Sequence, residues 1–183
     1  MSRTLAGLTL ALCAIVAGCG DDKTPLVGGG STTPPAAVAS LIGLTDDSRL
    51  VQFRANDTTQ VISTVPLTGV QSDPGDFPFT IAMDIRPLNN EIYALFSDDR
   101  LYKVAPSTGA LTLVGRPAFG AADVRALDFD PKADVIRAIA ISGENFRVSP
   151  VDGSILGTDT TLAYVAGDPN NGQTPSVEGV AYT

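Results

Sequence analysis

The sequence predicts an all-β protein made of β-propeller-like blade repeats of about 44 residues, forming a partial propeller. Its 18 Gly and 13 Pro indicate many turns, and its apolar runs are short. The chain also repeats itself. Asp84-Ile-Arg-Pro returns 44 positions later as Asp128-Phe-Asp-Pro, and Leu101-Tyr-Lys-Val returns at the same offset as Asn145-Phe-Arg-Val. Four short strands in about 44 residues are typical of one propeller blade.

In the clearest copy, the expected strands are separated by turn-forming residues such as Pro-Leu-Asn-Asn and Ser-Asp-Asp-Arg. These strands are Thr80–Ile85, Ile92–Phe96, Leu101–Val104 and Ala110–Val114. Residues 41–79 match the last three strands of a blade without its first. Val177–Tyr182 aligns with Val124–Phe129 as a lone first strand.

The domain at 41–183 therefore contains three blade repeats and is incomplete at both ends, whereas closed propellers have about four to eight blades. A homodimer could complete one propeller, which would cover the exposed strand edges of a partial ring. Closure as another kind of β-sandwich is the alternative fold.

Residues 1–18 have the features of a signal peptide, because Arg3 is followed by an apolar stretch, Leu5–Val16, that is too short to span a bilayer. Val16-Ala-Gly-Cys19 then resembles the lipobox of bacterial lipoproteins. That resemblance implies lipidation of Cys19 and anchoring to a lipid bilayer. The alternative is an ordinary cleaved signal in which Cys19 is incidental.

Residues 19–40, rich in Gly, Pro, Ser and Thr, form a lipid-anchored flexible linker. Gly20, not Asp, follows the cysteine. The lipoprotein resemblance therefore implies a place in the cell envelope at the outer membrane or cell surface rather than at the inner membrane.

The composition excludes several kinds of chemistry. The chain has no His, and both cysteines, Cys13 and Cys19, lie in its first nineteen residues. The domain at 41–183 therefore cannot hold a Ser-His-Asp or Cys-His site, or a zinc site of His and Cys. A net charge of −8 disfavours nucleic-acid binding. We expect a protein without a cofactor and without enzymatic activity, although calcium and carboxylate chemistry stay open.

Two arginines form the main candidate binding site. Arg137 and Arg147 hold the blade positions of Tyr93 and Lys103 in the preceding copy, and they are expected to lie opposite one another across a hairpin. Asp130 and Asp134 precede Arg137 closely enough to form an internal ion-pair network with it. The alternative is an anion or a substrate carboxylate held by the two guanidinium groups.

Other acidic residues have a structural interpretation and a functional one. Asp84 and Asp128 recur at one blade position, where Asx-type turns ahead of Pro87 and Pro131 are favoured over a carboxylate ring around a channel. No catalytic carboxylate pair stands out. The loop that contains Asp168 and Asn170 is a weak metal candidate with oxygen ligands, and a plain turn is favoured there.

Further stretches carry a resemblance to a known family. They are Glu91-Ile-Tyr-Ala-Leu, Arg100-Leu-Tyr-Lys-Val, Gly143-Glu-Asn-Phe-Arg and Val180-Ala-Tyr-Thr, together with the two Asp-x-x-Pro motifs. In this order they resemble a widespread family of exported bacterial propeller-type domains known as a domain of unknown function. The resemblance implies a fold and no activity. Domains of that family usually continue beyond the final motif.

We therefore expect a membrane-anchored cell-envelope lipoprotein with a propeller-type binding or scaffold domain, whose ligand is a protein or a glycan. One alternative is a propeller hydrolase that depends on carboxylates or a divalent metal. The other is a truncated remnant of a longer propeller protein.

Overall fold

The computed structural model describes residues 11–14, 40–45 and 47–182, and all regular elements of this part are β-strands. They form three four-stranded antiparallel sheets, each in chain order, so the predicted all-β fold is confirmed. Within these residues no helix is long and apolar enough to span a membrane. The strands are β1 (Ala11–Ala14), β2 (Ser40–Leu44), β3 (Arg49–Arg54), β4 (Asp57–Pro66), β5 (Thr80–Ile85), β6 (Ile92–Phe96), β7 (Leu101–Val104), β8 (Leu111–Gly115), β9 (Val124–Asp130), β10 (Val135–Ala140), β11 (Asn145–Val148) and β12 (Ile155–Asp159).

The second and third sheets correspond to the two clear copies of the sequence repeat. β5, β6 and β7 have the bounds expected from the sequence, and β8 begins one residue later than expected. Asp84 and Asp128, the two equivalent aspartates, both lie in the first strand of their sheet. The 44-residue offset therefore relates one whole sheet to the next.

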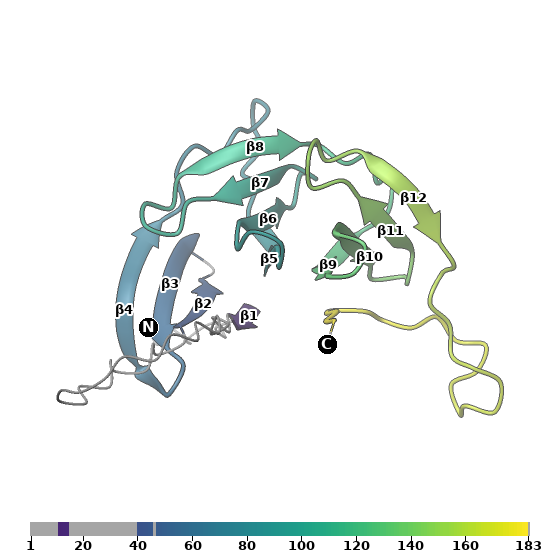
Figure 1. The fold of residues 1–183 in the computed structure, drawn as a ribbon. Helices are drawn as coiled ribbons and strands as arrows, with labels where there is room; N and C mark the ends of the chain where they lie inside the picture. Colours follow the sequence, from purple (N-terminus) through teal and green to yellow (C-terminus); the bar gives the residue numbers. More distant parts are fainter. Residues whose placement is uncertain (1–10, 15–39, 46, 183) are drawn as a thin grey trace, which may run out of the picture.

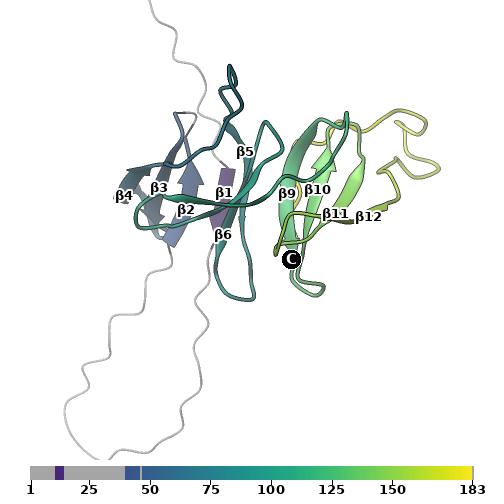
Figure 2. The same ribbon diagram turned by 90° about the horizontal axis from the view of Figure 1, so that it is seen from above.

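The three sheets stand side by side in an open arc (Figure 1). The first strand of each sheet, which we call its inner strand, lies on the concave side, and the fourth strand lies on the convex side. Seen from above, the sheets form successive layers in chain order (Figure 2). The described residues do not close into a ring.

Two apolar cores fill the spaces between neighbouring sheets. One joins the second and third sheets, where the rings of Tyr93 and Phe129 meet edge to face at 5.1 Å. The other joins the first and second sheets around Phe96 and Tyr102, whose rings lie 5.0 Å apart. The buried Tyr93 hydroxyl also donates a hydrogen bond to the carbonyl of Pro150, at 3.1 Å. Burial of both faces explains why β6 is apolar at all five positions.

The first sheet differs from the expectation of a blade without its first strand. The structure places β1 in that position, antiparallel to β2, with Cys13 opposite Ile42 and Ala14 opposite Leu41. An apolar segment suits a signal peptide and a buried inner strand equally well, since both environments exclude charged side chains. The same residues therefore have two competing assignments, and cleavage before Cys19 would remove β1.

Glycines in the turns before the outer strands allow the sheets to approach closely. Gly109 precedes β8 with a φ of +71°, and a Cβ atom there would overlap the carbonyl of Pro66 at the end of β4. In the next repeat, Gly153 has a φ of +72° and faces Gly115 of β8. A Cβ atom on Gly115 would overlap the carbonyl of Asp152. The repeated Gly109 and Gly153 therefore have two functions, a left-handed turn and a backbone contact between sheets.

These contacts predict unequal effects of two similar substitutions. Gly109→Ala should lower the free energy of unfolding by about 3 kcal/mol, because a strained backbone adds to overlap with Pro66. Gly120→Ala is the matched control, since Gly120 has a φ of +70° with nothing within 4 Å of the added Cβ, and should cost about 1 kcal/mol. Urea unfolding of both variants measures the difference. Equal losses would contradict a close contact at Gly109.

Candidate functional site

Asp84 and Asp128 form a carboxyl pair on neighbouring inner strands. Asp84 Oδ2 accepts a hydrogen bond of 2.7 Å from the backbone N–H of Phe129 in β9. Asp128 Oδ2 accepts a bond of the same length from the N–H of Tyr182, at the far end of the chain. Each carboxyl thus ties its strand to the next segment around the arc. This corrects the predicted Asx-type turns, because these backbone partners lie 45 and 54 positions later in the chain.

The carboxyl pair affects the protonation of its members. Burial, together with the neighbouring Asp84 carboxyl, raises the pKa of Asp128 to about 7, against the opposing effect of the Tyr182 N–H. Two carboxyl groups in contact cannot both ionise without repulsion. Asp128 therefore keeps its proton up to about neutral pH. The sequence did not reveal that these two carboxyl groups meet, because a sequence does not show contacts across sheets.

Arg137 and Arg147 lie opposite one another in β10 and β11, as the repeat predicts. Asp159 of β12 neutralises both, through an ion pair with Arg137 and a contact of 3.2 Å with the Nε atom of Arg147. The hydrogen bond from Arg137 lowers the pKa of Asp159. Arg137 also donates to Asn145 Oδ1, at 3.1 Å. The two guanidinium groups therefore belong to an internal ion-pair network.

The predicted carboxylate partners of Arg137 make direct hydrogen bonds with other groups, although, besides the Ala133 N–H, the charge of Arg137 still lowers the pKa of Asp130. Asp134 accepts a hydrogen bond of 2.8 Å from Nε of Arg86 in the second sheet, which lowers the pKa of Asp134. Asp130 Oδ1 accepts from the backbone N–H groups of Lys132 and Ala133, both at 3.0 Å. The sequence did not indicate Asp159 or Arg86 as a partner of these residues. Asp159 could be found only by extending the hairpin register to β12, and Arg86 only from contacts between sheets.

The weak metal candidates lie in a turn. Asp168 Oδ1 accepts a hydrogen bond of 2.8 Å from the backbone N–H of Asn170. This bond is typical of an Asx turn. Among the described residues there is no group of three or more His, Cys, Asp or Glu side chains placed to hold a metal ion. Cys19, the predicted lipidation site, lies outside the described residues.

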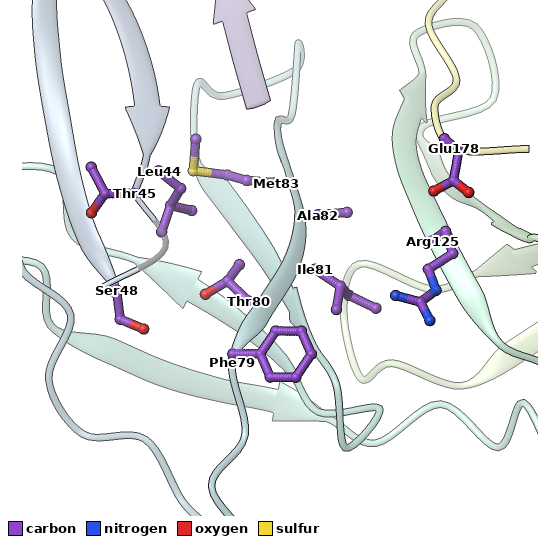
Figure 3. A pocket seen from close by; sticks show the side chains of 10 residues that line it. All are labelled: Leu44, Thr45, Ser48, Phe79, Thr80, Ile81, Ala82, Met83, Arg125 and Glu178. Carbon is purple, nitrogen blue, oxygen red and sulfur yellow. The ribbon is translucent and has the colours of Figure 1, made fainter. Parts of the chain in front are cut away.

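A cavity of about 380 Å³ lies where the β2–β3 turn meets the first residues of β5 and β9 (Figure 3). Its apolar wall includes Phe79, which is 53% exposed, together with Ile81 and Met83. Its lining residues are Leu44, Thr45, Ser48, Phe79, Thr80, Ile81, Ala82, Met83, Arg125 and Glu178. The sequence did not predict this cavity, because its walls come from three sheets and the C-terminal segment.

Two polar atoms in the cavity wall are left unsatisfied by the described residues. Thr80 Oγ1 and Arg125 Nε are both buried and lack a hydrogen-bond partner within this part of the chain. The outer nitrogen of Arg125 bonds to Asp123 at 2.8 Å, and Glu178 adds a second negative charge nearby. Buried polar atoms normally have partners, so these two atoms are exceptions among the described residues.

The carboxyl pair predicts a pH effect of defined sign. A raised pKa means that the native state binds a proton on Asp128 that the unfolded chain has released between about pH 4 and pH 7. The proton bound to Asp128 therefore stabilises the native state. This stabilisation is fully present below about pH 4 and is lost as the pH rises through about 7. Asp128→Asn should therefore become more stable, relative to the wild type, as the pH rises from 5 to 8.

Denaturant unfolding at several pH values measures this difference. Asp76→Asn, at an exposed loop position, controls for the loss of one surface charge. A stability difference between wild type and Asp128→Asn that stays constant with pH would contradict a shared proton in the carboxyl pair.

Comparisons with known proteins give a family. No curated protein matches the chain. Among solved structures, the crystal structure of the computationally designed Ika4 protein is similar with a TM-score of 0.46 and 14% sequence identity, covering 79% of this chain and 74% of that one. Residues 49–183 match a family model described as a domain of unknown function, DUF4394. This match covers most of the chain, which therefore belongs to the DUF4394 family.

Proposed function

We propose that this chain is a lipid-anchored binding module of the bacterial cell envelope. The anchoring rests on the sequence Val16-Ala-Gly-Cys19 directly after an apolar run. Acylation at Cys19 and the polar linker at 19–40 would hold the β domain off the bilayer, at the outer membrane or the cell surface. A displayed domain of this kind meets ligands that are themselves outside the cytoplasm.

The three sheets are proposed to be consecutive blades of a propeller. In support, each sheet is a four-stranded meander in chain order, and the inner strands gather on the concave side of an arc (Figure 1). The hairpin glycines and the carboxyl pair also repeat the same contacts from sheet to sheet. Repetition of contacts around an axis is the construction principle of propellers.

The single observation that carries the binding function is the cavity with two unsatisfied polar atoms. Thr80 Oγ1 and Arg125 Nε have no hydrogen-bond partner among the described residues, both side chains line the cavity, and the exposed ring of Phe79 offers an apolar surface beside them. A few polar groups in a mostly apolar cavity are typical of small-molecule sites. A sugar has this combination of hydroxyl groups and an apolar C–H face.

Charge favours a neutral ligand over an anion. Arg125 is already balanced by Asp123 and lies near Glu178, and the whole chain has a net charge of −8. An anionic ligand would meet these carboxylates at close range. We therefore propose a glycan of the cell envelope as the ligand class.

One observation favours the hydrolase alternative. A carboxyl group with a pKa of about 7, as at Asp128, can serve as a proton donor at neutral pH. However, Asp84 and Asp128 use their oxygens on backbone N–H groups and contact one another. Catalytic carboxyl pairs of glycoside hydrolases lie about 5 Å or more apart, with substrate or water between them. The binding module is therefore the better supported function.

Arg125→Met tests the cavity, because it removes the Nε donor and keeps the length of the side chain. Titration with glucose and N-acetylglucosamine tetrasaccharides should show weak binding to the wild type and about tenfold weaker binding to Arg125→Met. Arg116→Met is the control, since Arg116 is an exposed arginine outside the cavity that also forms an ion pair, with Asp73 at 3.3 Å. Equal affinity in all three proteins, or no binding to any, would remove the glycan proposal.

Lipidation has a separate test with its own control. Cells that express the wild type should incorporate labelled palmitate into the protein, whereas Cys19→Ala should abolish the label, because the thiol that accepts the lipid is gone. Cys13→Ala should label like the wild type, since Cys13 lies inside the apolar run. Label in Cys19→Ala at the level of the wild type would show that Cys19 is not the anchor.

A further inference from the structure

The loop that joins β4 to β5 presents an aromatic side chain to solvent. It comprises residues 67–79 and projects beyond the sheets next to β5 (Figure 2). Phe77 in this loop is 92% exposed, more than any other large apolar side chain of the described residues. Burial of a Phe ring is favourable, so an exposed ring keeps that free energy available for a ligand.

The first half of the loop is fixed to the second sheet. The hydroxyl of the buried Tyr102 accepts a hydrogen bond from the N–H of Gln71 at 3.0 Å and donates to the carbonyl of Gln71 at 3.3 Å. The carboxylate of Asp73 pairs with two arginines, Arg100 at 3.0 Å and Arg116 at 3.3 Å. The exposed ring therefore belongs to a segment that is anchored on the side that precedes it.

The second half of the loop is fixed on both sides of the exposed ring. The N–H of Asp76 donates to the carbonyl of Asp73 at 3.0 Å, which closes a turn. Phe79 donates its N–H to Ser97 Oγ at 3.1 Å, and its carbonyl accepts from the N–H of Ser97 at 2.8 Å. Between these contacts, Pro78 restricts its own backbone and that of the residue before it. The loop thus holds the ring outside the molecule in a defined place.

The exposed ring lies close to the cavity of the proposed glycan site. Phe79 belongs to the cavity wall, and Figure 3 shows it at the edge of the lining side chains, where the chain enters β5. The Cα atoms of Phe77 and Phe79 are at most about 7 Å apart, because two residues cannot extend the chain further. This distance is comparable with the length of one sugar unit. A glycan chain that leaves the cavity beside Phe79 therefore has a second aromatic ring within reach.

The charges of the loop favour a neutral glycan over a lipid surface. Asp76 is exposed and directly precedes Phe77. A carboxylate at this position is repelled by anionic headgroups and is costly to transfer into a bilayer together with the ring. The same carboxylate can accept hydrogen bonds from sugar hydroxyl groups, while the C–H face of the sugar covers the ring.

We propose that Phe77 forms a second subsite of the glycan site, on which one sugar unit stacks while the adjacent unit occupies the cavity beside Phe79. The site therefore recognises a neutral oligosaccharide rather than a single sugar. Because the loop is already fixed, little ordering of the ring opposes binding. The inference deepens the proposed function and rests on it.

A fluorescent reporter tests contact between the ring and the glycan. The chain contains no Trp, so Phe77→Trp introduces a single indole and keeps a flat aromatic ring at the subsite. The full-length lipoprotein in mild detergent is titrated with the tetrasaccharide that the wild type binds more tightly. Emission of Phe77→Trp should shift to shorter wavelength with the tetrasaccharide and not with the single sugar. Leu88→Trp, at a 70% exposed position in another turn, is the matched control and should show no shift.

Affinities test whether the ring contributes to binding. Phe77→Ala should bind the tetrasaccharide about tenfold more weakly than the wild type, because one stacked ring is lost. Its affinity for the single sugar should stay unchanged. Phe77→Tyr should keep the affinity of the wild type, since the flat ring remains, and Leu88→Ala should also bind like the wild type.

The outcomes separate the subsite from the cavity. Tetrasaccharide binding that is weakened by Arg125→Met and unaffected by Phe77→Ala would overturn the subsite and leave the glycan proposal intact. Absence of binding to the wild type would overturn both. The lipoprotein is also reconstituted into vesicles of phosphatidylethanolamine and phosphatidylglycerol without glycan. A shift of Phe77→Trp emission there, absent from Leu88→Trp, would assign the ring to the bilayer and overturn the subsite.

Discussion

Face-to-face packing between neighbouring sheets is the constraint on which the rest of the structure depends. A sheet whose apolar side chains project from both faces must bury each face against another element. The second sheet has a neighbour on each side, and all five residues of β6 are buried. The third sheet has one described neighbour, and three of the four residues of β11 are not fully buried. Burial is thus greatest where a sheet has two neighbours, and β6 is wholly apolar there, whereas β11 contains Asn145 and Arg147.

This constraint explains where polar groups occur inside the molecule. Asp84 is one of two buried polar residues among the described ones, and it lies where two inner strands approach each other. Apolar packing is not directional, so it does not fix how far one sheet slides along the next. A carboxyl group that accepts a backbone N–H bond of the next strand does fix that position. The carboxyl pair and the hairpin glycines therefore set the alignment of sheets that the apolar cores hold together.

The sequence predicts contacts within a sheet better than contacts between sheets. Strand bounds in the second sheet and the facing positions of Arg137 and Arg147 follow from alternation, turn residues and the repeat offset, all of which are local. Asp84 binding to Phe129 and Arg86 binding to Asp134 join residues 45 and 48 positions apart, through geometry that no local pattern encodes. The cavity was missed for the same reason. β1 shows a different limit, since one apolar composition fits two environments.

Comparison of equivalent positions shows what the repeat preserves. Lys103 faces Tyr93 in the second sheet and bonds to Glu91 at 2.7 Å, with its ammonium group 5.6 Å from the Tyr93 ring. At the same positions of the third sheet, Arg137 and Arg147 share Asp159. The side chains differ completely, yet each site places a carboxylate beside the cationic group. The repeat therefore preserves register and charge balance and leaves residue identity free. Because the cavity lies where three sheets meet, substitutions in any one of them can alter its lining without changing the fold.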